Sequence, residues 1–185
     1  MHTFRRICVF CGSKPGLEAI YTDVAVSLGK YLAKNNIELI YGGSQIGLMG
    51  NIANAVLKDK GKVTGVIPHF MTKKEVVHHN LSELIIVDTM HERKLKMSEL
   101  CDAVITLPGG YGTFDELFEM LSWSQLGIHN KPIGLLNVNG YYDDLLQMLN
   151  KMTNKGFLKT IDKERLIVSN DIESLFGLFN SLYEK

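Results

Sequence analysis

Short apolar runs alternate with longer amphipathic stretches from one end of the chain to the other. The short runs are rich in valine, isoleucine and leucine, as buried parallel strands are, and the longer stretches repeat their apolar positions at nearly helical spacing. We predict strands at residues 7–11, 38–41, 63–67, 84–87, 103–107, 133–137 and 166–168, and helices at 18–35, 48–59, 90–101, 113–126, 141–155 and 172–183. This alternation predicts an α/β fold, a single Rossmann-like, doubly wound domain over residues 1–185, with a mainly parallel sheet of about seven strands and helices on both faces.

Three glycine-bearing segments follow predicted strands. They are CGS at 11–13, GGS at 42–44 and GGYG at 109–112. In open parallel sheets, ligands bind beyond the carboxyl ends of the strands. We therefore expect these segments, with Ser13 and Gly43 among them, to line one ligand-binding cleft, which we call the mouth.

The segment 108–116, PGGYGTFDE, is the most informative part of the chain, because it joins an apolar strand to an amphipathic helix. Glycines there leave backbone N–H groups bare at a helix N-terminus, where the partial positive charge of the aligned peptides attracts an anion such as phosphate. A second interpretation is a capping box, since Thr113 is followed by Glu116 three positions later. A cap requires neither three glycines nor Tyr111 among them.

The glycine pattern favours a mononucleotide over NAD or ATP. The dinucleotide fingerprint G-x-G-x-x-G is missing after the first strand, and after the fifth strand Asp115 stands where its third glycine would be. No G-x-x-x-x-G-K-[ST] sequence occurs either. A nucleoside triphosphatase and a dehydrogenase are therefore disfavoured.

A charged segment, MHERKLK at 90–96, opens the helix before the fifth strand. Its first turn, which begins at Met90, should lie near the mouth, and Arg93 could face the ligand, since a guanidinium grips phosphate or hydroxyl oxygens in a fork. Lys94 points about 100° away around the helix and should make a different contact. Seen alone, the segment is also typical of a solvated helix face.

Composition and charge exclude several classes of function. The chain has 20 Lys and Arg against 20 Asp and Glu, so no overall field favours nucleic acid or an acidic membrane. No apolar run reaches the roughly 18 residues of a membrane span, and no signal peptide is recognisable, so we expect a cytoplasmic protein. The three cysteines, an odd number, agree with a reducing compartment.

Neither a metal nor a cofactor is expected. Cys8 and Cys11 form a CxxC pattern, but in a strand an offset of three points their side chains to opposite faces. The histidines His78, His79 and His91 show no metal-ligand spacing.

Several motifs together resemble a known family. They are FCGS at 10–13, YGGSQIGLMG at 41–50, GVIP at 65–68, MHERK at 90–94, PGGYGTFDE at 108–116 and QLGIHNKPIGLLNVNGYYD at 125–143. The chain resembles the Lonely Guy family, the cytokinin riboside 5′-monophosphate phosphoribohydrolases, whose bacterial members are often labelled lysine decarboxylases. The resemblance covers almost the whole chain in order, and the pairing of MHxRK with PGGxGTxxE is specific to this group.

The resemblance implies hydrolysis of the N-glycosidic bond of an adenosine 5′-monophosphate, often N6-substituted, to the free base and ribose 5-phosphate. Arg93 and Glu116 match the family's catalytic arginine and glutamate. The expected substrate-binding residues also include Ser13, Gly43 and Met90, the loop residues Gly109, Gly110, Tyr111, Gly112 and Thr113, and the surrounding Glu75, Lys94, Asp115 and Ser122. The family likeness further implies a homodimer whose partner is a small nucleoside monophosphate. Ser44, Asp115 and Ser122 depart from the family's usual residues and leave the fit around the base open.

The chemistry of glycosidic cleavage suits this pair of residues. The reaction passes through an oxocarbenium-like state. A carboxylate such as Glu116 can stabilise the positive charge of this state or activate the water that attacks the sugar. Arg93 nearby should lower the pKa of Glu116 and keep it ionised. No residue can be assigned as general acid for the leaving base.

Two other activities must be weighed against this one. A non-catalytic nucleotide or molybdenum-cofactor carrier of similar fold is the main alternative, and it would not need the pair Arg93 and Glu116. A pyridoxal phosphate decarboxylase needs a Schiff-base lysine, and no lysine stands in a recognisable setting for one.

Overall fold

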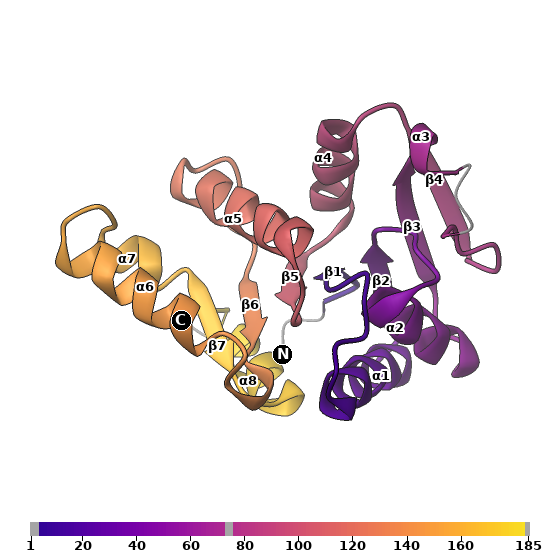
Figure 1. Ribbon diagram of the computed structural model, residues 1–185, viewed down its shortest axis with the longest axis horizontal. Helices are drawn as coiled ribbons and strands as arrows, with labels where there is room; N and C mark the ends of the chain where they lie inside the picture. The colour runs from indigo at the N-terminus through magenta and orange to yellow at the C-terminus, as the bar shows by residue number, and fades with distance from the viewer. Residues whose placement is uncertain (1–3, 73–75, 184–185) are drawn as a thin grey trace.

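Seven parallel strands form one sheet at the centre of the computed structural model, which describes residues 4–72 and 76–183. The strands are β1 Arg6–Phe10, β2 Glu38–Tyr41, β3 Val63–Pro68, β4 Glu83–Val87, β5 Ala103–Thr106, β6 Ile133–Leu136 and β7 Leu166–Ser169. They lie in the order β4-β3-β2-β1-β5-β6-β7, and every neighbouring pair is parallel (Figure 1). The predicted α/β fold with a parallel sheet is confirmed.

Helices alternate with the strands as the apolar spacing predicts. The long helices are α1 Ala19–Lys34, α2 Gly47–Lys58, α4 Met90–Leu100, α5 Tyr111–Gln125, α6 Asp143–Asn154 and α8 Ile172–Ser181. Three short elements, α3 His69–Thr72, the 3₁₀ turn η1 Val138–Gly140 and α7 Thr160–Lys163, were not predicted, because a single turn shows no periodicity. None of the helices described is long and apolar enough to cross a membrane.

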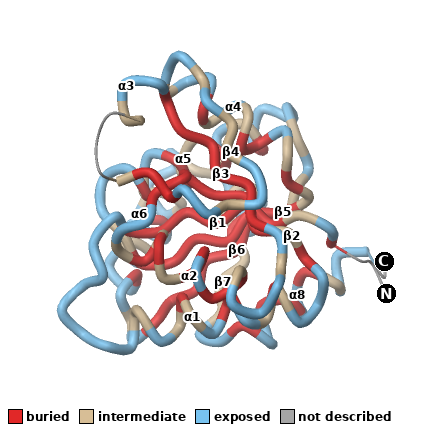
Figure 2. The backbone as a smooth tube through the Cα atoms, turned by 90° about the vertical axis from the view of Figure 1, so that its right-hand side faces the viewer, coloured by how far each residue is buried: buried red, intermediate tan, exposed pale blue. Residues whose placement is uncertain are grey.

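Two layers of helices bury the two faces of the sheet. One apolar cluster joins the sheet to α1, α2 and α8, and the other joins it to α4, α5 and α6 (Figure 1). Figure 2 shows the buried residues running along the strands between these layers. Cys8 and Cys11 fall into different clusters, so the prediction that they face opposite sides is confirmed.

The strand order reverses at β1, which positions the candidate site. The chain builds one half of the sheet from β1 to β4 and then returns to pair β5 with the other edge of β1, with Phe10 opposite Thr106. The loops after β1 and β5 leave in opposite directions and open a crevice, the usual ligand site of doubly wound sheets. The Gly12 N–H donates to the Pro108 carbonyl at 3.0 Å and ties the two loops together.

Candidate active site

A cavity of about 390 Å³ opens at the carboxyl edge of the sheet, beside this crevice. The loops after β1, β2 and β5 and the starts of α2, α4 and α5 contribute to it. Its lining residues are Cys11, Ser13, Gly42, Ser44, Ile46, Met49, Met71, Val76, Arg93, Gly110, Tyr111, Gly112, Thr113 and Glu116. The three glycine-bearing segments predicted to meet do so here.

Arg93 reaches this cavity from the first turn of α4. Thr89 caps the helix by accepting from the Glu92 N–H at 3.1 Å, which fixes where the helix begins. Arg93 is buried, at 8% exposure, and its Nε donates to the Val66 carbonyl at 3.1 Å. A side chain at Gly42 would collide with this guanidinium, so the glycine after β2 leaves the room that the arginine occupies.

Glu116 faces Arg93 from the second turn of α5. Its Oε1 lies 3.4 Å from Arg93 Nη1, and the residue is also 8% exposed. Burial raises the pKa of Glu116 to about 7, because an ionised carboxylate loses its hydration there, although the charge of Arg93 acts in the opposite direction. The predicted direction of the Arg93 effect is confirmed, but desolvation outweighs the ion pair, so the pKa of Glu116 lies above its ordinary value and not below it.

The capping-box interpretation of Thr113 and Glu116 is wrong. The helix α5 begins at Tyr111, two residues earlier than predicted, and its N-cap is Gly110, which supplies no side-chain cap. Thr113 and Glu116 therefore lie inside the helix, and the Glu116 side chain points to Arg93 instead of the helix start.

The glycine loop leaves backbone donors without protein partners. Among the described residues, no hydrogen bond uses the N–H groups of Tyr111, Gly112 or Thr113, the first three of α5. At Gly110 and Gly112 an added Cβ would meet no atom within 4 Å, so packing of the fold does not explain these glycines. Bare donors beside open space at a helix N-terminus suit a phosphate group.

Lys94 makes a separate set of contacts, as the helical geometry predicted. Its ammonium lies 3.1 Å from Asp115 and 3.1 Å from Glu119, both on α5. These two carboxylates raise the pKa of Lys94 against the opposing effect of its burial. Lys94 and Asp115 thus join α4 to α5 beside the cavity without lining it.

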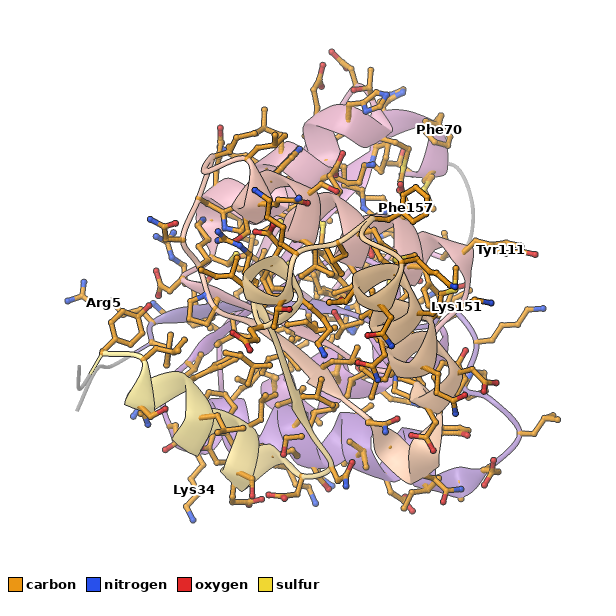
Figure 3. The ribbon with its side chains drawn as sticks, turned by 90° about the vertical axis from the view of Figure 1, so that its left-hand side faces the viewer. Arg5, Lys34, Phe70, Tyr111, Lys151 and Phe157 are labelled. Atoms are coloured by element: carbon orange, nitrogen blue, oxygen red, sulfur yellow. The ribbon has the colours of Figure 1, made fainter. Side chains whose placement is uncertain are left out.

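The remaining predicted residues lie at varying distances from the cavity. Gly43 does not line the cavity, and its carbonyl accepts from the His78 N–H at 3.0 Å. Met90 contacts the Arg93 guanidinium through its sulfur. Ser122 is exposed on α5 and does not line the cavity. Glu75 lies outside the described residues. Tyr111 is 98% exposed, and Figure 3 shows its ring pointing away from the body of the molecule.

Sequence reasoning missed the apolar part of the cavity. Ile46, Met49, Met71 and Val76 contribute apolar side chains to the same cavity as the charged pair. Ile46 and Met49 follow the GGS loop at a spacing of three, which places them on one face at the start of α2 and could have been noticed. Nothing in the sequence distinguishes Met71 or Val76 from core residues.

The described lining of the cavity contains neither a cluster of metal ligands nor a lysine. Within residues 4–72 and 76–183, no three histidine, cysteine, aspartate or glutamate side chains are grouped so that they could hold a metal ion. No lysine is among the described residues that line it, whereas a pyridoxal phosphate enzyme needs one for its Schiff base.

Comparison with known proteins agrees with this geometry. The structure is similar to the molybdenum cofactor binding protein from Rippkaea orientalis, with 21% identity, a TM-score of 0.72 and 97% of each chain covered. It is also similar to the molybdenum cofactor carrier protein from Chlamydomonas reinhardtii, with 18% identity, a TM-score of 0.69, and 98% of this chain and 99% of that one covered. At such identities the likeness shows the fold alone.

Sequence relatives are much closer. The chain is 50% identical to cytokinin riboside 5′-monophosphate phosphoribohydrolase LOG2 of Arabidopsis thaliana over 90% of this chain and 78% of that protein. It is 52% identical to the probable cytokinin riboside 5′-monophosphate phosphoribohydrolase LOGL1 of Oryza sativa subsp. japonica over 90% and 74%. Residues 49–178 match the family model described as possible lysine decarboxylase. The chain therefore belongs to that family, which includes the Lonely Guy proteins that its motifs resemble.

Proposed function

We propose that this protein hydrolyses the N-glycosidic bond of an adenosine 5′-monophosphate, with or without an N6 substituent, and releases the free base and ribose 5-phosphate. The observation that carries the proposal is the buried pair of Arg93 and Glu116, 3.4 Å apart in the cavity that also holds the bare N–H groups of α5. The names of relatives that are about half identical to this chain support the same reaction.

Each part of the cavity has a role in this reaction. The glycine loop holds the 5′-phosphate and fixes the ribose, so that binding energy from a non-reacting group is used at the reacting carbon. Glu116, as a carboxylate, stabilises the positive charge that develops on the sugar or activates the attacking water. Arg93 donates to ribose or phosphate oxygens through guanidinium N–H groups that Glu116 does not contact.

The proposal also includes the expected domain organisation, compartment, oligomeric state and further contacts with the nucleotide. They are a single nucleotide-binding domain, a cytoplasmic homodimer, and contacts from Lys94, Asp115 and Ser122 around the nucleotide. The apolar residues Ile46, Met49, Met71 and Val76 offer a surface for the base or its N6 substituent.

The test is to incubate the protein with AMP, N6-isopentenyladenosine 5′-monophosphate and adenosine and to measure the free base. We expect base from at least one monophosphate and far less from adenosine, which lacks the phosphate. Absence of base from both monophosphates would overturn the proposal. The ratio of kcat/KM for the two monophosphates then identifies the preferred base.

The carrier alternative makes a different prediction for the purified protein. A molybdenum-cofactor carrier would contain molybdenum and would be coloured, and it would bind its ligand without turnover. The buried Arg93 and Glu116 pair disfavours this reading, because a carrier gains nothing from a carboxylate whose pKa is raised to about 7.

A further inference from the structure

Three consecutive carbonyl groups that lead into the glycine loop each accept a hydrogen bond from outside the loop. The Tyr142 hydroxyl donates to the Leu107 carbonyl at 2.7 Å. The Gly12 N–H donates to the Pro108 carbonyl at 3.0 Å, and the Tyr141 hydroxyl donates to the Gly109 carbonyl at 2.7 Å. Two neighbouring tyrosines and one backbone amide thus hold the loop.

These bonds also set the direction of the N–H groups. The peptide bonds of the described residues are trans, and in a trans unit the carbonyl and the N–H point in opposite directions. Holding the Pro108 carbonyl therefore orients the Gly109 N–H, and holding the Gly109 carbonyl orients the Gly110 N–H. In the part of the chain that the structure describes, the Gly110 N–H has no hydrogen-bond partner, and Gly110 lines the cavity.

The peptide between Gly109 and Gly110 needs such a restraint more than most. Glycine adopts positive and negative φ values with little difference in energy, so a peptide flanked by two glycines rotates easily. If it rotated by half a turn, a carbonyl oxygen with partial negative charge would replace the donor that a phosphate needs.

The tyrosines are themselves held in place by the segment that carries them. The Tyr142 N–H donates to Asn137 Oδ1 at 2.8 Å, and Asn137 Nδ2 donates to Asp143 Oδ1 at 2.7 Å. The Tyr141 ring packs edge-on against Tyr142 and against Tyr21, with centroids 4.9 and 5.8 Å apart. The direction of the Tyr141 hydroxyl is therefore fixed by several independent contacts.

We propose that Tyr141 is a positioning residue, whose hydroxyl holds the Gly109–Gly110 peptide so that the Gly110 N–H faces the phosphate of the ligand. Tyr142 plays the matching part at the start of the loop by holding the Leu107 carbonyl. This inference rests on the proposed function, because it takes the loop to be the phosphate site. Neither tyrosine touches the reacting carbon.

The test measures binding of ribose 5-phosphate by calorimetry, which requires no turnover. Tyr141 is partly exposed, so Tyr141→Phe removes the hydroxyl without opening the core. We expect this variant to bind ribose 5-phosphate roughly 3- to 10-fold more weakly, the usual effect of one hydrogen bond. The matched control is Tyr21→Phe, since the Tyr21 hydroxyl is bonded to Glu18 and not to the loop; its affinity should stay within about twofold of the native value.

Two further measurements separate positioning from general support of the structure. With AMP as substrate, Tyr141→Phe should lower kcat/KM by at least the same factor, because part of the phosphate binding energy is used at the reacting carbon. Affinity for free adenine, which has no phosphate, should not change.

The outcomes distinguish the two proposals. Equal affinity of Tyr141→Phe and the native protein for ribose 5-phosphate would overturn the positioning role and leave the proposed reaction standing. Loss of adenine affinity in parallel would also overturn it in favour of a merely structural role. Failure of the native protein to bind ribose 5-phosphate or AMP would overturn the proposed function and the positioning role together.

Discussion

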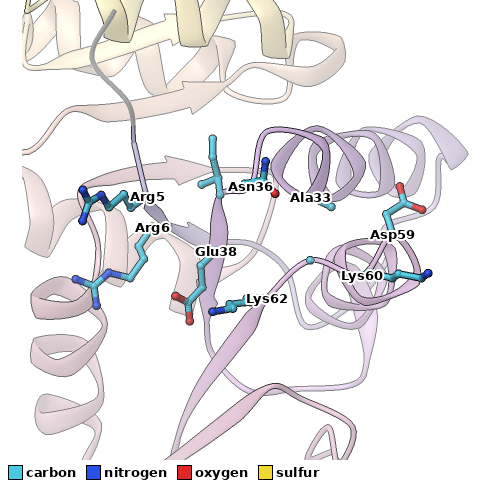
Figure 4. A pocket seen from close by; sticks show the side chains of 10 residues that line it. Arg5, Arg6, Ala33, Asn36, Glu38, Asp59, Lys60 and Lys62 are labelled. Atoms are coloured by element: carbon cyan, nitrogen blue, oxygen red, sulfur yellow. The ribbon is translucent and has the colours of Figure 1, made fainter.

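Cavities lie at both edges of the sheet, and one at the amino edge is larger than the candidate active site. Figure 4 shows this amino-edge cavity, which has a volume of about 740 Å³, against about 390 Å³ for the candidate active site. The amino-edge cavity is also rich in charge, with Arg5, Arg6, Glu38, Lys60 and Lys62 among its lining residues. Volume and charge alone would therefore select the wrong edge.

The difference lies in how each edge holds its charges. The charged side chains at the amino edge are exposed or half-exposed, and Figure 4 shows Arg5 and Lys60 on opposite sides of the cavity. Water and salt screen such charges. At the carboxyl edge Arg93 and Glu116 are buried against each other, where electrostatic interactions are much stronger than in water.

The backbone adds to this contrast. Helices α1 and α2 end at the amino edge, where the N–H groups of the C-cap residues Asn35 and Asp59 bond to carbonyls of their own helices. The starts of α1, α2 and α5 lie at the carboxyl edge, and none of the three has a side-chain cap. Uncapped helix starts favour anions, so within residues 4–72 and 76–183 the carboxyl edge is where unpaired backbone donors and a buried charged pair occur together.

Removing the carboxylate at each edge is the strongest test of this comparison. Glu116→Gln keeps the shape of the side chain but cannot carry the negative charge that the transition state needs, so we expect kcat to fall by about 10³-fold or more. Binding of AMP should persist, because the phosphate loop is unchanged. The assay is release of free base, with calorimetry for binding.

Glu38→Gln is the matched control at the amino edge. The Glu38 carboxylate accepts from the Thr64 hydroxyl at 2.6 Å, and the glutamine oxygen can still do so. Turnover within about twofold of the native protein is expected. A comparable loss in both variants would break the distinction between the edges.

The buried setting of Glu116 predicts a pH dependence in the neutral range. With a pKa of about 7 in the free protein, the ionised fraction rises from roughly one tenth at pH 6 to roughly nine tenths at pH 8. Because the ionised form is the active one in the proposed mechanism, kcat/KM should increase about tenfold over this range. The Glu116→Gln variant should lose the part of this increase that comes from the carboxylate.

The ligand itself complicates the profile, since a phosphate monoester loses its second proton near pH 6. Binding of ribose 5-phosphate over the same pH range measures that contribution separately. A kcat/KM that falls as the pH rises through 7 would contradict the carboxylate role and assign Glu116 as the acid that protonates the leaving base.

Much of the carboxyl edge could be predicted from the sequence, because a parallel sheet fixes where its loops meet. The glycine segments after β1, β2 and β5 and the first turn of α4 had to come together once the strands were placed, and Arg93 followed from that placement. The motif pairing then pointed to Glu116. These features depend on local pattern and topology, which the sequence displays directly.

The features that were missed depend on tertiary packing. The pKa of Glu116 moves upward because of the side chains that bury it, and no local pattern reports that burial. The proposed positioning role of Tyr141 depends on the hydrogen bond from its hydroxyl to the Gly109 carbonyl, 32 residues away in the sequence. Met71 and Val76 reach the cavity through a segment without periodicity, so they look like ordinary apolar residues.

The finest test of the comparison replaces a glycine at the site and a matched glycine away from it. Gly112 in α5 and Gly177 in α8 are both exposed helical residues at which an added Cβ would meet no atom within 4 Å. Alanine stabilises a helix relative to glycine by up to about 1 kcal/mol, so neither Gly112→Ala nor Gly177→Ala should lower the thermal midpoint.

Only the variant at the site should affect the ligand. The methyl group in Gly112→Ala would occupy space beside the bare N–H groups where the phosphate must approach, so we expect affinity for ribose 5-phosphate to fall by roughly 3- to 10-fold, about the effect of one lost hydrogen bond. Gly177→Ala should bind as the native protein does. If Gly112→Ala keeps full affinity, the open space at this glycine is not the phosphate site, and the anion-binding role of the carboxyl edge must lie elsewhere in the cavity. If both variants lose affinity, the loss comes from a general effect on the helices and not from the phosphate site. The proposed contrast between the two edges would then not hold.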